Sequence, residues 1–175
     1  MTRCNNICLV GLMGAGKTTV GRQLAKRFGR RFVDADHEIE ARTGVRIPTI
    51  FEIEGEAGFR RREAETIEAL TRESGLVLAT GGGAVIDPVS RRRLRESGLV
   101  VYLRVLPLVL YERTRHDRNR PLLQVADPLA RLEELFAQRD PLYREVADVV
   151  VDTSSGGLGS LVRRVEQEIR KRCEP

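Results

Sequence analysis

A glycine-rich run near the start of the chain carries the residue types that bind nucleotide phosphates. Residues 11–18 read Gly-Leu-Met-Gly-Ala-Gly-Lys-Thr and match G-x-x-x-x-G-K-[ST], directly after a short apolar run. The glycines let the loop curl so that backbone N–H groups point at phosphate oxygens. Lys17 is a compact cation for the β- and γ-phosphates, and the Thr18 hydroxyl is a ligand for Mg²⁺. The motif predicts a nucleoside triphosphate site, with a glycine-rich turn that binds nothing as the alternative.

Other residues must separate the protein classes that share this loop, which include small-molecule kinases, GTPases and motor ATPases. A guanine-reading N-K-x-D sequence is absent from the chain, which disfavours a GTPase. The strand-borne acidic residues typical of an ATPase are hard to place, because the third apolar run ends in Gly81-Gly82-Gly83. A small-molecule kinase is the class that remains best supported.

Two acidic residues, Asp34 and Asp36, follow the second apolar run. The carboxyl end of a parallel strand is where ligands bind, and alternation along the strand sends both carboxylates to the same side. One acid could hold a metal through water while the other orients a hydroxyl acceptor. The alternative is that Asp36 only caps a helix over residues 36–43.

Two basic segments supply candidate partners for a carboxylate ligand. Consecutive arginines on a helix diverge by about 100° each, so at most one residue of the run Arg60-Arg61-Arg62 faces a given pocket. Arg60, nearest the helix start, is the candidate for pairing with a carboxylate. Arg139, in the segment Arg-Asp-Pro-Leu-Tyr, is a second candidate of the same kind. Solvated charged helix faces are the alternative for both.

The apolar pattern predicts the scaffold that positions these residues. Short continuous apolar runs, typical of strands covered on both faces, occur at residues 7–10, 31–33, 76–79, 99–103 and 149–151. Apolar spacing and cap residues predict helices at residues 17–28, 36–43, 58–74, 88–97, 107–115, 128–139 and 158–172. This alternation predicts a parallel α/β sheet. The arginine-rich stretch from about residue 116 to 127 is expected to be a mobile surface loop.

Composition excludes several further classes. The 175 residues, 41% of them hydrophobic, suit one domain with a single core, and no run approaches the roughly 20 apolar residues of a membrane span. The formal net charge of +5 comes with only 5% aromatic residues and with Asp and Glu interleaved among the arginines. That pattern favours a small anionic ligand over nucleic acid.

Cysteine usage and the N-terminus bear on the compartment. Cys4, Cys8 and Cys173 are an odd number without a CxxC pair, so neither a disulfide framework nor a structural zinc site is expected. The N-terminus has no apolar core of a secretory signal. A reducing cytoplasmic location is the resulting expectation.

Taken together, these segments resemble the shikimate kinase family. The matching segments occur in the family's order between about residues 6 and 152, at residues 11–19 (GLMGAGKTT), 34–38 (DADHE), 55–60 (GEAGFR), 79–84 (ATGGGA), 120–123 (RPLL) and 139–143 (RDPLY). The phosphate loop is shared by many families, whereas the other motifs in combination are specific.

The resemblance implies a fold. It is a P-loop NTPase-type three-layer α/β/α sandwich, like that of nucleoside-monophosphate kinases, with a five-stranded parallel sheet in the order 2-3-1-4-5. Residues 1–175 would form a single kinase domain with a substrate-binding subdomain at about 36–62 and a lid at about 113–124. The family also implies a monomer.

The resemblance implies an activity and a set of site residues. The γ-phosphoryl group of Mg·ATP would pass to the 3-hydroxyl of shikimate, giving 3-phosphoshikimate and ADP, a step towards chorismate and the aromatic amino acids. The catalytic residues would be Lys17, Asp36 and Arg120. The nucleotide would be bound by Gly14, Ala15, Gly16, Lys17, Thr18, Thr19, Arg113 and Arg120. Shikimate would be held by Asp36, Arg60, Gly82 and Arg139, with both of these arginines at the ring carboxylate. Magnesium would be held by Thr18 and, through water, Asp34.

Some features depart from the family pattern, and other functions stay open. Thr18 stands where Ser is more usual, and His37 and His116 match no family role and are expected to face solvent. The loop at residues 153–160 is small and glycine-rich where the family's adenine pocket closes. A kinase for another hydroxylated acid such as gluconate, a nucleotide-dependent switch without transfer, and a catalytically idle relative are the alternatives.

Overall fold

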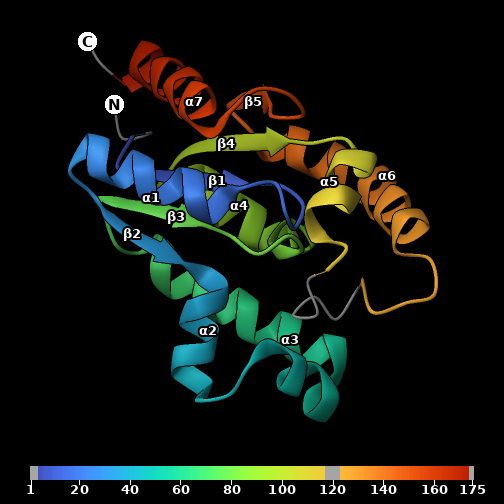
Figure 1. Ribbon diagram of the computed structural model, residues 1–175. Helices are drawn as coiled ribbons and strands as arrows, with labels where there is room; N and C mark the ends of the chain where they lie inside the picture. The colour runs from blue at the N-terminus through green and yellow to red at the C-terminus, as the bar shows by residue number, and fades with distance from the viewer. Residues whose placement is uncertain (1–3, 117–122, 174–175) are drawn as a thin grey trace.

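The computed structural model describes residues 4–116 and 123–173, which are built around one five-stranded sheet (Figure 1). The strands are β1 (Asn6–Val10), β2 (Arg31–Asp34), β3 (Leu76–Ala79), β4 (Gly98–Arg104) and β5 (Val149–Asp152). All neighbouring strands are parallel, and their order is β2-β3-β1-β4-β5. The expected strand order is therefore confirmed.

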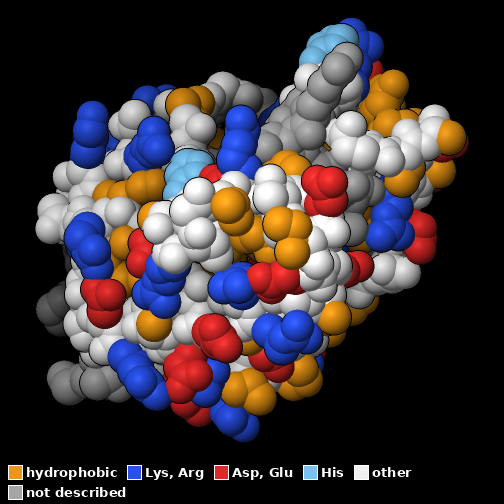
Figure 2. All heavy atoms as spheres, turned by 90° about the horizontal axis from the view of Figure 1, so that it is seen from below, with side chains coloured by type: hydrophobic (Ala, Val, Ile, Leu, Met, Phe, Trp, Pro, Cys, Tyr) orange, Lys and Arg blue, Asp and Glu red, His pale blue; other side chains and the backbone are white. Residues whose placement is uncertain are grey.

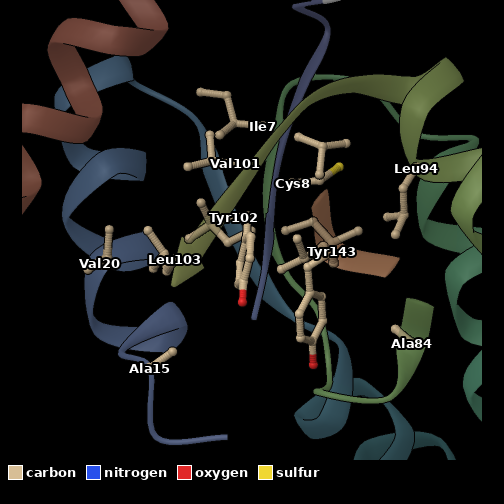
Figure 3. Packing of buried hydrophobic residues seen from close by; sticks show 14 of the residues in the cluster. Ile7, Cys8, Ala15, Val20, Ala84, Leu94, Val101, Tyr102, Leu103 and Tyr143 are labelled. Carbon is tan, nitrogen blue, oxygen red and sulfur yellow. The ribbon is translucent and has the colours of Figure 1, made fainter. Parts of the chain in front are cut away.

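Burial explains why the strands read as continuous apolar runs. Every residue of the central strand β1 is buried, because helices cover the sheet on both faces. Figure 3 shows strands of the sheet between Val20 on one side and Leu94 on the other. The edge strand β5 differs, since Val149 and Val151 are buried while Val150 is exposed.

The helices are α1 (Lys17–Phe28), α2 (Ala35–Thr43), α3 (Ile47–Thr71), α4 (Pro88–Ser97), α5 (Pro107–Thr114), α6 (Pro128–Val146) and α7 (Leu158–Cys173), with a short 3-10 helix, η1 (Ala84–Ile86). Helices α1 and α7 contact each other, as do α3 and α4 and also α4 and α6. The Asp87 side chain caps α4 by accepting the N–H of Val89 at 3.0 Å, ahead of Pro88 in the first turn.

Two helices extend further than the sequence predicts. Helix α3 begins at Ile47 rather than at residue 58, and it kinks at Gly55, whose backbone has φ 71° and ψ −179°. A positive φ favours glycine, so this residue marks the bend. Helix α6 continues past residue 139 through Pro141 to Val146. Proline removes one helical hydrogen bond there, while burial of Tyr143 and Val146 anchors the last turns.

The two ends of the described chain are joined by a disulfide bond between Cys4 and Cys173. The expectation that the cysteines form no disulfide is wrong for this pair, whose Cα atoms are 5.8 Å apart although 169 residues separate them in sequence. Spacing along the chain does not reveal that α7 ends beside the start of β1. The remaining thiol, Cys8, is buried in the sheet, and burial raises its pKa to about 12. Among the described residues, no helix combines the length and apolar character needed to cross a membrane.

Candidate active site

A cavity of about 410 Å³ opens where the carboxyl ends of β1, β2 and β3 meet. The carboxyl ends of parallel strands share one edge of the sheet, so the segments that follow them converge there. The site residues expected from the sequence that line this cavity are Gly14, Gly16, Lys17, Thr18, Thr19, Asp34, Asp36, Arg60, Gly82, Arg113 and Arg139. Ala15 is buried and does not line it. Arg120 lies outside the described residues.

The glycine-rich loop between β1 and α1 forms one end of the cavity. Gly14 has a φ of 80°, and a Cβ atom there would lie 2.5 Å from Cγ2 of Thr114, so no other residue fits. Gly16, with φ 95°, is the N-cap of α1 and provides no side-chain cap. The first N–H groups of α1 therefore stay available to an anion at the positive end of the helix.

Lys17 is folded over the phosphate loop. Its Nζ donates hydrogen bonds to the carbonyl oxygens of Gly11 at 2.6 Å and Leu12 at 2.9 Å, and the side chain is largely buried. The loop thus holds a positive charge beside the N-terminus of α1. A cation and a helix N-terminus together suit the phosphates of a nucleotide.

Thr18 and Asp34 connect the phosphate loop to the end of β2. The Thr18 hydroxyl donates to Oδ2 of Asp34 at 2.6 Å, which leaves the hydroxyl lone pairs available to a cation. Oδ1 of Asp34 accepts the N–H groups of Asp36 at 3.0 Å and His37 at 3.1 Å and so caps α2. The capping residue is therefore Asp34, and not Asp36 as the sequence alternative supposed.

The donor set at this point fits Mg²⁺. A hydroxyl and a carboxylate are hard oxygen ligands, and this ion usually takes one or two protein oxygens and completes its shell with water and phosphate. Within residues 4–116 and 123–173, no group of three or more His, Cys, Asp or Glu side chains is placed to hold a metal by itself. An ion held by Thr18 and Asp34 would thus depend on nucleotide oxygens.

Helix α3 brings a buried ion pair to the opposite end of the cavity. Nη1 of Arg60 lies 2.8 Å from Oε1 of Glu63, whose side chain is only 4% exposed. Burial raises the pKa of Glu63, and the charge of Arg60 opposes that rise. Sequence reasoning missed Glu63 because it ends a charged run that looks solvated. Its i,i+3 spacing from Arg60 was the available signal.

Of the three consecutive arginines, Arg60 alone lines the cavity. Arg61 is exposed, and Arg62 forms an ion pair with Glu54 at 2.5 Å. This arrangement follows from the angular divergence of neighbouring residues on a helix.

The three glycines after β3 allow four charged side chains to approach the backbone. A Cβ atom at Gly83 would overlap the Arg60 guanidinium, and one at Gly81 would lie 2.7 Å from Oδ1 of Asp36 and 2.9 Å from Oε2 of Glu63. A Cβ atom at Gly82 would lie 3.5 Å from Nη1 of Arg139. At Gly81 and Gly83, charged side chains thus occupy the space that a Cβ atom would need, whereas at Gly82 the Arg139 guanidinium is in ordinary contact distance.

Arg139 on α6 is buried, and burial lowers the pKa of its guanidinium, with the nearby charge of Arg60 acting in the same direction. Nη1 of Arg139, Nε of Arg60 and Oε2 of Glu63 are buried and have no hydrogen-bond partner among the described residues. Buried donors of this kind normally have partners. Two guanidinium groups with unmatched donors in one cavity are suited to a carboxylate ligand.

Arg113 on α5 borders the nucleotide end of the cavity. Its Nη1 donates to the carbonyl of Gly14 at 3.4 Å and its Nη2 to the carbonyl of Thr153 at 3.0 Å. It therefore ties the phosphate loop to the segment that follows β5. His37 and His116 are both exposed, and His37 also lines the cavity.

Charges outside the cavity are mixed. Figure 2 shows the face formed by α2 and α3, where Lys and Arg side chains are interspersed with Asp and Glu side chains. Over the described residues of this face, no continuous basic stripe appears.

Comparisons with known proteins agree on one family. Residues 13–170 match the family model described as shikimate kinase. A shikimate kinase of Aromatoleum aromaticum is 64% identical over 172 residues, which cover 96% of this chain and 98% of that protein. One of Dechloromonas aromatica is 68% identical over 166 residues, covering 95% of this chain and 91% of that protein.

Solved structures give the same result. The shikimate kinase from Acinetobacter baumannii in complex with shikimate has a TM-score of 0.95 at 49% identity, covering 99% of this chain and 97% of that one. A gluconokinase from Sinorhizobium meliloti shares the fold, with a TM-score of 0.60 at 21% identity. The match covers 98% of this chain and 95% of that one. The expected P-loop, nucleoside-monophosphate-kinase-like α/β/α fold class is confirmed.

Proposed function

This chain belongs to the shikimate kinase family, and from that premise we propose that it transfers the γ-phosphoryl group of ATP to the 3-hydroxyl of shikimate. The products are 3-phosphoshikimate and ADP. The observation that carries the proposal is the pair of unmatched guanidinium donors, on Arg60 and Arg139, in the same cavity that the phosphate loop borders. These donors can bind the carboxylate of an acceptor molecule that lies beside a bound nucleotide.

The phosphate half of the cavity supports phosphoryl transfer through charge and position. Such a transfer needs its two oxygens nearly in line and its spread negative charge stabilised, with little covalent work by the protein. Lys17 and the first N–H groups of α1 supply positive charge to the phosphates. Arg120, which lies outside the described residues, is proposed to add to it.

A divalent cation, which we propose is Mg²⁺, would be held by the Thr18 hydroxyl and, through water, by Asp34. When bound, it neutralises charge on the phosphate oxygens. The Thr18 hydroxyl keeps its lone pairs for this ion because its proton is donated to Asp34.

The acceptor half is proposed to fix the direction of attack. Arg60 and Arg139 bind the ring carboxylate, and the backbone at Gly82 approaches the ring. Asp36 then orients the attacking hydroxyl and accepts its proton late in the transfer. The glycine loop lies between the phosphate loop and the acceptor half, because Gly82 is close to both Met13 and Arg139. This proximity supports the division of roles between the two halves.

Water must be kept from the site, or ATP would be hydrolysed instead of transferring its phosphoryl group. We propose that the region from about residue 113 to 124 acts as a lid over the nucleotide. Arg113 at its start already contacts the phosphate loop, and residues 117–122 lie outside the described part of the chain.

We also propose three further properties. The family resemblance implies a substrate-binding subdomain at about residues 36–62 and a monomeric state, and the third property is a cytoplasmic location.

The function is tested by ADP formation with purified protein and ATP in four mixtures: with shikimate and Mg²⁺, without either one, and with gluconate in place of shikimate. We expect ADP only when shikimate and Mg²⁺ are both present. ADP formation driven equally well by gluconate would favour the other kinase class. No shikimate-dependent ADP would favour a switch or an idle relative.

A further inference from the structure

The carbonyl groups of the glycine loop after β3 are all engaged within the protein. The Gly81 carbonyl accepts the N–H of Ala84 at 3.1 Å, and the Gly83 carbonyl accepts the N–H of Ile86 at 3.1 Å. The Gly82 carbonyl accepts the hydroxyl of Tyr143. By contrast, no backbone carbonyl in the part of the chain that the structure describes accepts the N–H of any of these three glycines. All three glycines line the cavity, so these donors lie beside whatever the cavity binds.

Three consecutive glycines have more conformational freedom than any other tripeptide, so the loop needs an external anchor. The middle one, Gly82, lies between the phosphate loop and Arg139, since a Cβ atom there would be 3.4 Å from the Met13 nitrogen and 3.5 Å from Nη1 of Arg139. The C=O and N–H of a trans peptide point in opposite directions. Fixing the Gly82 carbonyl therefore also fixes the direction of the Gly83 N–H.

Tyr143 is built to be that anchor. It lies one turn after Arg139 on α6, it is fully buried, and its ring packs on that of Tyr102 with centroids 4.8 Å apart. Figure 3 shows its hydroxyl pointing towards the loop that leads to Ala84. Burial raises the pKa of Tyr143 above its ordinary range, against the opposing charge of Arg139. The hydroxyl thus keeps its proton and acts as a donor.

We propose that Tyr143 is a positioning residue for the acceptor half of the site: its hydroxyl ties the Gly82 carbonyl to the core and so aims the glycine loop and the adjacent Arg139 at shikimate. This inference rests on the proposed function. Arg139 and Tyr143 are four residues apart on α6. This one helix therefore positions both the Arg139 guanidinium and the glycine loop against the acceptor.

The test compares Tyr143→Phe with Tyr102→Phe, which remove the same atom from the two halves of one buried ring pair. The Tyr102 hydroxyl donates to Oδ1 of Asp140 at 2.7 Å and does not touch the glycine loop. For Tyr143→Phe we expect the KM for shikimate to rise about fivefold to tenfold, the effect of one ordinary hydrogen bond, with the KM for ATP within about twofold of wild type. For Tyr102→Phe we expect thermal stability to fall while both KM values stay within about twofold.

A rise in the KM for shikimate confined to Tyr143→Phe supports the inference. An unchanged KM in Tyr143→Phe, or equal changes in both variants, overturns it and leaves only a structural role. The wild type in the same assay reports on the function separately. If it forms no shikimate-dependent ADP, the proposed function fails, whereas an active wild type with an unaffected Tyr143→Phe ends only this inference.

A second measurement needs no variant and covers the case in which Tyr143→Phe does not fold. Shikimate is titrated into the wild type and followed by NMR. We expect the amide signals of Gly82 and Gly83 and the ring signals of Tyr143 to shift together, with the ring signals of Tyr102 nearly unmoved. Tyr143 signals that stay in place while those of Gly82 shift would overturn the inference.

Discussion

Arg60 and Glu63 form an ion pair at the wall of the cavity, with Nη1 and Oε1 2.8 Å apart and one helical turn between them on α3. The Glu63 side chain is nearly buried, while the Arg60 side chain is 20% exposed. A buried carboxylate next to an arginine restricts that arginine to few orientations. Glu63 therefore aims Arg60 into the cavity.

Glu63→Gln is expected to loosen Arg60 and to raise the KM for shikimate by about tenfold, the cost of one charge-assisted hydrogen bond, while the KM for ATP stays nearly constant. Steady-state kinetics with each substrate varied in turn measures this. Glu56→Gln is the matched control, because Glu56 contacts the same guanidinium at 3.4 Å from the solvent side with 51% exposure. Equal effects of the two substitutions would contradict the role of Glu63.

The buried carboxyl of Glu63 also makes stability depend on pH. Burial raises its pKa above the ordinary value of 4.5, with Asp36 adding to the rise and Arg60 and Arg139 opposing it. Between pH 4.5 and the raised value, the folded state binds more protons than the unfolded state. The stability that this group contributes is thus greatest below pH 4.5 and falls as the pH rises through that window.

Urea unfolding of wild type and Glu63→Gln across that pH range isolates this contribution, because the other carboxyl groups are common to both proteins. We expect the free energy of unfolding of the wild type to fall relative to that of the variant as the pH rises. A difference that stays constant, or that grows in favour of the wild type, would show that Glu63 does not titrate in this way.

Asp36→Asn is expected to lower kcat by about 100-fold or more and to leave the KM for ATP almost unchanged, since an amide cannot accept the proton of the attacking hydroxyl. Glu38→Gln is its control on the same helix, because Glu38 pairs with Arg42 at 3.0 Å and is not among the residues that line the cavity. A wild-type kcat in Asp36→Asn would remove the acceptor role.

Thr18→Val is expected to raise the Mg²⁺ concentration needed for half-maximal activity by about tenfold or more, because the side chain keeps its size and loses the oxygen ligand. Thr18→Ser keeps the hydroxyl and is expected to stay close to wild type. Titrations of activity against Mg²⁺ at fixed ATP decide this. Equal Mg²⁺ requirements in Thr18→Val and the wild type would place the metal elsewhere.

Much of the fold could be predicted from the sequence because its signals are local. A continuous apolar run predicts strand β3 at its observed bounds, and an apolar face does the same for α1. Six short motifs carry the resemblance to shikimate kinases, and the family match confirms it. These motifs persist in sequence because a phosphate loop or a glycine turn is a contiguous piece of backbone.

Features that depend on contacts between distant residues were missed. The Cys4–Cys173 bond joins residues 169 positions apart, and nothing local brings them together. Glu63 resembles a solvated charge until α3 packs beside the glycine loop, and Tyr143 acquires its partner only when α6 packs beside the same loop. The turns of α6 after Pro141 exist because tertiary burial outweighs a local helix breaker.

The most direct test is a crystal structure of the protein with ADP, Mg²⁺ and shikimate bound together. We expect the shikimate carboxylate within hydrogen-bonding distance of both Arg60 and Arg139, one ring hydroxyl at Asp36, and the nucleotide phosphates against residues 11–18. Shikimate bound away from the two arginines, with Asp36 turned to bulk solvent, would contradict the proposed site.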